Sequence, residues 1–218
     1  MLKGVIFDMD GTMFDTERLT GHCWKKLGET LGFNVTDELL NDCRGKNTAV
    51  IRRLYKEAFG SDFDYDKARE QKRMLFNEAI DRDGVPIKKG LKELLSYLNE
   101  KGIKSVVATS TEKARAEELL KCAGVYERMD AFVYGDDIKQ SKPDPEIFKV
   151  AAAKIGCQKE ECLVIEDSEA GLLAGISFGG EVIFIPDVAE VSKETRAKVS
   201  KTLENLEAVI GWLEVYNR

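Results

Sequence analysis

Five short apolar runs, rich in β-branched side chains, recur along the chain and limit what it can fold into. They occupy residues 5–7, 105–108, 131–134, 163–165 and 182–185. Each has the length and composition of a strand that is covered on both faces, which is typical of a parallel sheet. From residue 105 onward the runs alternate with apolar residues at helical spacing. This alternation predicts a doubly wound α/β fold, in which helices cover both faces of a parallel sheet.

The segment 16–85 follows a different pattern, because no strand-like run occurs in it. Apolar residues recur there at helical spacing in three stretches, 19–31, 51–59 and 74–79. We therefore expect an α-helical domain inserted after the first strand. In this division residues 1–15 and 86–218 form the α/β core, and residues 16–85 form the helical insert. The chain of 218 residues is long enough for one domain with such an insert, or for two domains.

Charge is unevenly divided between these two parts. The insert has 13 basic and 13 acidic residues, whereas the α/β part has 20 and 26 and carries the whole net charge of −6. Acidic charge concentrated in the α/β part indicates a cation site there, and ordinary solvated surface is the alternative explanation for most of it. The chain has no basic tail, so we do not expect it to bind nucleic acid.

Other features of the composition bear on where the protein works. No apolar stretch approaches the roughly 18 residues that span a bilayer, so no membrane partner is expected. The five cysteines are scattered and form no CxxC pair, which is typical of reduced thiols in a cytoplasmic protein. We expect a monomer or a weak dimer.

Acidic and small residues follow the first strand directly, as Asp8, Asp10, Gly11 and Thr12. Side chains alternate along a strand, so the Asp8 and Asp10 carboxylates are expected on one side at its carboxyl end. Ligands of open α/β sheets bind at this edge. Two carboxylates this close repel each other and need a cation, a shared proton or both. We interpret them as a catalytic or metal-binding pair, with an acidic turn that caps a helix as the alternative.

A second motif, Thr109, Ser110 and Thr111, follows the run 105–108. It places hydroxyl and backbone N–H groups at a strand end that enters a helix, which suits a phosphate group. A helix N-cap explains these residues equally well.

Two further motifs carry charge. Lys142 lies before Pro143, which favours an extended backbone in the loop that leads into a helix, and a solvated lysine is the alternative. Glu166 and Asp167 follow the run 163–165. Two adjacent carboxylates at a strand end, facing the first pair, predict an oxygen-ligand site suited to Mg²⁺, with a helix cap as the alternative.

In order and spacing the four motifs resemble those of the haloacid dehalogenase superfamily, whose first motif is Asp-x-Asp-Gly-Thr/Val. The helical insert and the Glu-Asp-Ser-x-x-Gly form of the fourth motif are similar to the β-phosphoglucomutase-like branch, which has a small α-helical cap. The resemblance covers the whole chain and implies a Rossmann-like core with strand order 5-4-1-2-3. It also implies a Mg²⁺-dependent phosphatase that acts on a small phosphorylated metabolite, such as a sugar phosphate.

The resemblance implies a role for each acidic residue. Asp8 would attack phosphorus and become an aspartyl phosphate, while Asp10 would protonate the leaving oxygen and then activate water. Mg²⁺ would be held by Asp8, the Asp10 backbone carbonyl and Asp167, with Glu166 in or next to the coordination shell.

The resemblance also implies which residues bind the phosphoryl group. These are Thr109 and Lys142, with Ser110 as a further candidate. In the insert, Arg44 and Lys46 are candidates for binding a second anionic group, because Arg matches phosphate geometry, and a solvated loop is the alternative.

A phosphomutase is the alternative activity, because the chain is similar to β-phosphoglucomutase even at Trp24. Two departures favour hydrolysis. The mutase has a histidine at the place of Thr20, and His22 cannot replace it, because two positions turn a helix by about 200°. Residues 112–113 are Glu-Lys where the mutase has Lys-Asn. A third possibility is a non-catalytic phosphoacceptor module, which would need neither the insert nor Asp10.

Overall fold

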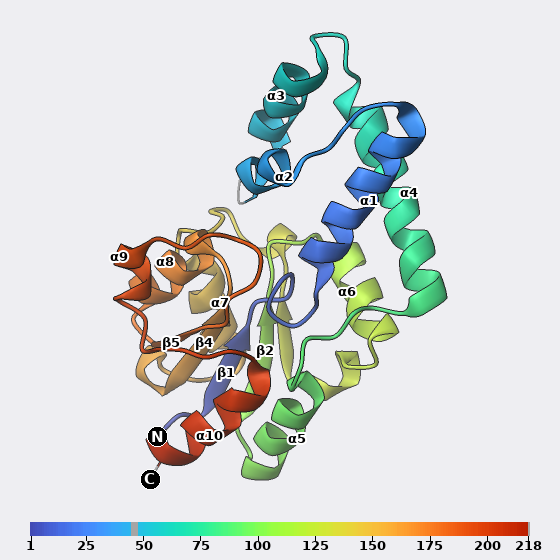
Figure 1. Cartoon of the computed structure of the whole chain (residues 1–218). Helices are drawn as coiled ribbons and strands as arrows, with labels where there is room; N and C mark the ends of the chain where they lie inside the picture. The colour runs from blue at the N-terminus through green and yellow to red at the C-terminus, as the bar shows by residue number, and fades with distance from the viewer. Residues whose placement is uncertain (45–47, 218) are drawn as a thin grey trace. The chain divides into compact units, whose positions relative to one another are not determined.

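The computed structural model describes residues 1–44 and 48–217, and the chain divides into two compact units (Figure 1). One unit consists of Met1–Asp15 and Val85–Arg218, and the other of Thr16–Gly84. The first unit contains the sheet, and the second contains four helices in its described part. Among the residues described, no helix is both long and apolar enough to span a membrane.

The α/β unit is built on a sheet of six strands in the order β3-β2-β1-β4-β5-β6, and each neighbouring pair is parallel. The strands are β1 (Gly4–Phe7), β2 (Lys104–Ala108), β3 (Ala131–Val133), β4 (Cys162–Glu166), β5 (Glu181–Phe184) and β6 (Lys201–Thr202). The predicted fold class and the strand order 5-4-1-2-3 are confirmed. Strand β6 was not predicted, because two exposed residues leave no pattern in a sequence.

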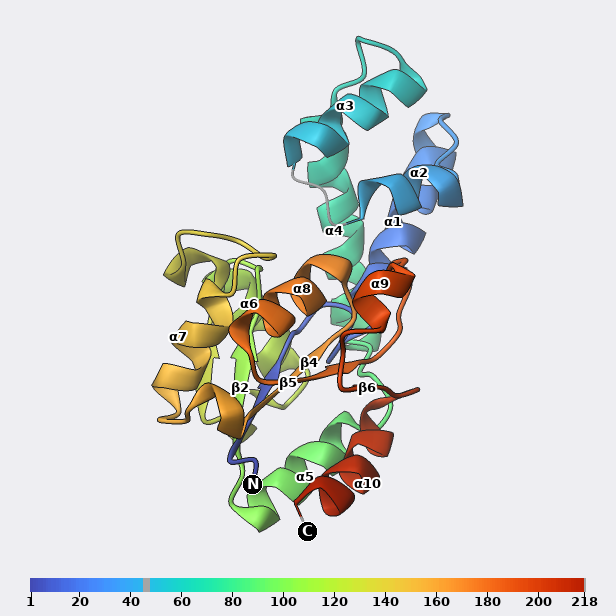
Figure 2. The same cartoon turned by 90° about the vertical axis from the view of Figure 1, so that its left-hand side faces the viewer.

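Helices bury the sheet. Ile6 of β1 lies in one apolar cluster with Phe148 of α7 (Glu146–Lys154) and Leu172 of α8 (Glu169–Phe178). Its neighbours Val5 and Phe7 are also fully buried and point to the opposite face, because side chains alternate along a strand. Helix α5 (Leu91–Lys101) contacts β2 and packs on α10 (Leu206–Tyr216), as Figure 2 shows. The remaining elements are α6 (Lys113–Cys122), α9 (Lys193–Arg196), η1 (Tyr126–Arg128), η2 (Gly135–Asp137) and η3 (Lys159–Glu161).

The helical unit contains α1 (Thr16–Leu31), α2 (Asp37–Cys43), α3 (Thr48–Phe59) and α4 (Tyr65–Asp83). The three expected helical stretches fall in α1, α3 and α4, whereas the seven-residue α2 was not predicted. Helix α1 packs on α4, and the rings of Trp24 and Tyr55 lie 4.6 Å apart between centroids. In α4 one expectation was wrong: Met74 is 59% exposed, and Phe76 and Ile80 are buried instead.

Candidate active site

Two strand ends bring the acidic motifs together in the α/β unit. Strands β1 and β4 are neighbours with Phe7 opposite Ile165, so Asp8 and Glu166 occupy the same edge of the sheet. The Asp8 backbone N–H continues the ladder by donating to the Ile165 carbonyl at 3.0 Å. Asp8, Glu166 and Asp167 are all buried, and each offers a carboxylate oxygen within 4.8 Å of the others.

Lys142 supplies the positive charge of this cluster. Its Nζ lies 2.5 Å from Asp8 Oδ1, 2.7 Å from Glu166 Oε1 and 3.2 Å from the Ala108 carbonyl oxygen. The lysine side chain is only 7% exposed. It comes from the loop before α7, where the Lys142–Pro143 peptide bond is cis.

Glu166 is held on both of its oxygens by the protein. Oε1 accepts from Lys142, and Oε2 accepts from the backbone N–H groups of Asp167 and Ser168 and from the Ser168 hydroxyl, at 2.9–3.0 Å. Gly171 in the first turn of α8 makes room for it, because a Cβ there would lie 1.7 Å from Oε1. The Glu166 carboxylate therefore orients Lys142, and it is also a candidate ligand for a cation.

Asp167 is fixed by the turn that follows β1. The Thr12 hydroxyl donates to Asp167 Oδ1 at 3.1 Å. Gly11 has a positive φ of 90°, and a Cβ at this position would lie 2.3 Å from Asp167 Oδ2. The turn therefore needs glycine both for its backbone and for the approach of the carboxylate.

The ionised groups of this cluster carry an excess of negative charge, which a cation or bound protons can offset. Three carboxylates and one ammonium group leave a net charge of −2 when all are ionised. Burial raises the pKa of Asp8 and of Asp167 well above the ordinary value, and neighbouring carboxylates add to both shifts. Burial lowers the pKa of Lys142, but the negative charges of Asp8 and Glu166 outweigh burial and raise this pKa above the usual range. A divalent cation with a preference for oxygen ligands fits this donor set and this charge.

The second motif fixes the Asp10 carboxylate. Its Oδ2 accepts from the Thr111 hydroxyl at 2.7 Å, and the Thr111 N–H donates to Thr109 Oγ1 at 3.0 Å. Thr109 is buried and Ser110 is exposed. Thr111 was expected as part of the hydroxyl motif that suits a phosphate group, but its hydrogen bond to Asp10 was not predicted.

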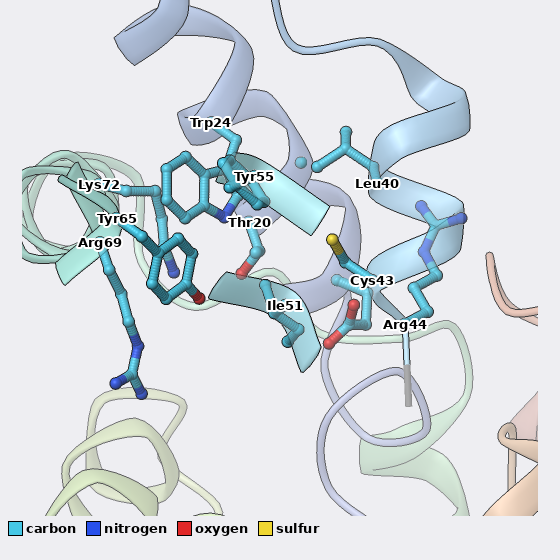
Figure 3. A pocket seen from close by; sticks show the side chains of 12 residues that line it. Thr20, Trp24, Leu40, Cys43, Arg44, Ile51, Tyr55, Tyr65, Arg69 and Lys72 are labelled. Carbon is cyan, nitrogen blue, oxygen red and sulfur yellow. The ribbon is translucent and has the colours of Figure 1, made fainter. Parts of the chain in front are cut away.

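The helical unit has a pocket of its own, with a volume of about 290 Å³ (Figure 3). Aromatic rings of Trp24, Tyr55 and Tyr65 form one wall. Arg44, the residue after α2, lies at the opposite end of the pocket from Arg69, and its guanidinium donates to Asn41 Oδ1. The pocket is lined by Glu17, Thr20, Gly21, Trp24, Leu40, Cys43, Arg44, Ile51, Tyr55, Tyr65, Arg69 and Lys72.

The sequence also drew attention to Lys46 and His22 in the insert. Lys46, the second candidate anion ligand of the insert, lies outside the described residues. His22 is exposed on α1 and does not line this pocket, although Thr20 does.

Comparison with known proteins gives concordant results. The sequence profile of the family described as haloacid dehalogenase-like hydrolase matches residues 5–185. A phosphorylated carbohydrates phosphatase of Thermotoga maritima is 30% identical over 187 residues, covering 84% of each chain. Hexitol phosphatase A of Escherichia coli is 30% identical over 95% of this chain and 93% of its own. The solved structure of a candidate β-phosphoglucomutase from Thermotoga maritima matches with a TM-score of 0.83 and 25% identity, over 98% of this chain and 99% of its own.

Proposed function

This chain belongs to the haloacid dehalogenase-like hydrolases and is a phosphoric monoester hydrolase, and from that premise we propose that it is a Mg²⁺-dependent phosphatase of small sugar-phosphate-like metabolites. One observation carries the proposal. Three buried carboxylates lie within 4.8 Å of one another, and the Lys142 ammonium group pairs with Asp8 and Glu166, which supports a site for a divalent cation beside a carboxylate that can attack phosphorus. Two relatives at 30% identity are named a phosphorylated carbohydrates phosphatase and a hexitol phosphatase, which supports this substrate class.

Asp8 is the nucleophile of this mechanism. Lys142 donates to its Oδ1, and Glu166 orients Lys142, so the other Asp8 carboxylate oxygen attacks phosphorus as the bond from phosphorus to the ester oxygen breaks. Lys142 lies beside the incoming phosphoryl oxygens and offsets the repulsion between carboxylate and phosphate. The Thr109 hydroxyl and the hydroxyl and N–H of Ser110 supply donors at the neighbouring strand end, which suits the remaining phosphoryl oxygens, whereas the Thr109 N–H is bonded to the Val133 carbonyl.

Asp10 is the acid and base. It gives its proton to the leaving ester oxygen, and it then takes a proton from the water that attacks the aspartyl phosphate, which releases phosphate and restores Asp8. The hydrogen bond from Thr111 fixes the Asp10 carboxylate for both steps.

Asp8, Asp167 and the Asp10 backbone carbonyl would hold Mg²⁺, with Glu166 next to it. When bound, the cation neutralises charge on the transferring phosphoryl group and polarises it toward attack. Gly11 and Thr12 keep Asp167 in the position that this requires.

The test is a panel of phosphorylated metabolites assayed for phosphate release, with Mg²⁺ and again with EDTA. We expect hydrolysis of sugar or sugar-alcohol phosphates that stops with EDTA and returns with Mg²⁺. Activity that does not depend on added metal would contradict the cation site. A parallel assay of β-glucose-1-phosphate isomerisation with a bisphosphate primer tests the mutase alternative, and isomerisation faster than hydrolysis would replace the phosphatase assignment.

A further inference from the structure

A fourth buried carboxylate lies at the edge of the sheet that carries the candidate active site. Asp187 follows β5, the strand next to β4, and the Ile185 N–H donates to the Glu166 carbonyl at 2.9 Å. The segment after β5 therefore runs beside the acidic motif. The Asp187 side chain is fully buried. No role in the proposed chemistry accounts for a buried carboxylate at this place.

Lys88 pairs with this carboxylate. Its Nζ lies 2.6 Å from Asp187 Oδ1, and the lysine side chain is 14% exposed. The Lys88 backbone N–H donates to the Met13 carbonyl at 2.9 Å, and Ile87 bridges to Phe14. The lysine thus belongs to a segment joined to the turn that holds Asp167.

The far end of the Asp187 segment is also fixed. Glu169, in the first turn of α8, accepts from the Ser192 N–H and hydroxyl at 2.9 Å and from the Thr195 hydroxyl at 2.6 Å. The segment between Ile185 and Ser192 is therefore anchored to the acidic motif at one end and to α8 at the other. Asp187 keeps its place through these contacts and through Lys88.

The pair lies beside the cation site on both sides. Asp187 comes two residues after Ile185, which is bonded to the Glu166 carbonyl, and Lys88 is bonded to the turn that holds Asp167. A negative charge next to a cation site strengthens cation binding, and a positive charge beside it does the opposite. The pair is therefore placed to act on the cation site with two opposed charges.

We propose that Lys88 and Asp187 set the affinity of the active-site edge for Mg²⁺, acting as positioning residues behind Asp167. This inference rests on the proposed cation site. Asp187 adds a negative charge that favours the cation, and Lys88 binds the Asp187 carboxylate and offsets this charge. The opposed charges leave the site able to bind Mg²⁺ and to release it.

The experiment is isothermal titration of the full-length protein with Mg²⁺ alone, without substrate. Asp187→Asn should weaken Mg²⁺ binding by about tenfold, and Lys88→Met should strengthen it by a similar factor. The double variant should bind Mg²⁺ within about threefold of the wild type, because both charges are gone. A pair with only a structural role would weaken binding in both single variants, or change neither, and either result would overturn the inference.

Two controls complete the test. Asp167→Asn should nearly abolish Mg²⁺ binding, and a wild-type protein that does not bind Mg²⁺ would reject the cation site itself rather than this inference. Lys88→Arg keeps the charge and should bind as the wild type does. If Asp187→Asn does not fold, the comparison of Lys88→Met with Lys88→Arg decides alone, and equal affinity in these two variants overturns the inference.

Discussion

Gly171 lies directly against the Glu166 carboxylate, so close that a Cβ on this glycine would stand 1.7 Å from Glu166 Oε1. Neither group can move away easily. Glu166 is held by four hydrogen bonds, and Gly171 is buried in the first turn of α8 with its N–H bonded to the Ser168 hydroxyl. The position of Lys142 depends on this contact, because Glu166 Oε1 is one of its three acceptors.

Gly171→Ala should therefore lower both stability and activity. We expect a loss of at least about 2 kcal/mol in the free energy of unfolding, as for an overpacked core, and a fall in kcat. Gly211→Ala is the matched control, because Gly211 is an exposed glycine in α10 with nothing within 4 Å of a Cβ. That variant should gain up to about 1 kcal/mol, since alanine favours a helix. Urea unfolding of both variants is the measurement, and equal effects would show that the contact with Glu166 does not matter.

Lys142→Met should remove most of the activity and make the protein more dependent on Mg²⁺ for stability. Without the ammonium group, Asp8 and Glu166 lose the positive charge that they share, and three buried carboxylates remain close together. We expect kcat/KM to fall at least about 100-fold, and the Tm in EDTA to fall more than the Tm in Mg²⁺. Lys139→Met, a change in the same loop at an exposed lysine, should alter neither. A Lys142→Met enzyme with normal turnover would reject the phosphoryl-binding role.

Thr111→Val should slow catalysis without changing substrate affinity greatly. The variant loses the hydroxyl that donates to Asp10 Oδ2, while the backbone bond to Thr109 is kept. We expect kcat to fall by about tenfold or more and KM to change little, because Asp10 acts in the chemical steps. Thr111→Ser restores the hydroxyl and should recover most of the rate. If serine and valine give the same kcat, the hydrogen bond has no part in catalysis.

Asp130 provides a pH-dependent contribution to stability at the opposite edge of the sheet. Its carboxylate accepts from Lys104 Nζ at 2.7 Å and from the Ser105 N–H at 2.8 Å. Burial raises its pKa, but these bonds outweigh burial and hold the pKa below the ordinary 3.8. A lowered pKa stabilises the fold above the unfolded-state value, and this gain is lost as the pH falls through the folded-state value.

Asp130→Asn should therefore lower the free energy of unfolding by about 1 kcal/mol near neutral pH. The difference from the wild type should shrink as the wild-type carboxylate becomes protonated. Urea unfolding at about pH 7 and about pH 3 measures it. A difference that is equal at both pH values would mean that the carboxylate charge contributes nothing.

Much of the fold could be predicted, because buried parallel strands leave continuous apolar runs. Each of the five predicted strands lies within one residue of its place in the structure. Shorter elements could not be predicted: β6 has two exposed residues, and α2 has a single buried residue, Leu40. In α4 polar residues are spread around most of the helix, so the spacing of its apolar residues does not indicate that Phe76 rather than Met74 faces inward.

The site could be predicted only in part, because only its strand-end residues follow a local pattern in the sequence. A strand end marks where Asp8, Glu166 and Asp167 lie, because parallel strands end at one edge. Contacts between distant segments leave no such mark. The hydrogen bond from Thr111 to Asp10 and the pairing of Lys88 with Asp187 join residues about 100 positions apart, and neither follows from local spacing. The role of Arg44 in substrate binding stays a prediction.

The central claim is that Asp8 carries the phosphoryl group during turnover. The direct measurement is acid-quenched mass spectrometry of the peptide that contains Asp8, after mixing with p-nitrophenyl phosphate and Mg²⁺. Asp10→Asn is the most informative variant, because p-nitrophenol leaves without an acid, whereas release of the phosphoryl group needs the base. We expect a phosphorylated Asp8 that accumulates in Asp10→Asn and is absent in Asp8→Asn. Turnover by Asp8→Asn at the wild-type rate, or an Asp10→Asn peptide that never carries phosphate, would contradict it.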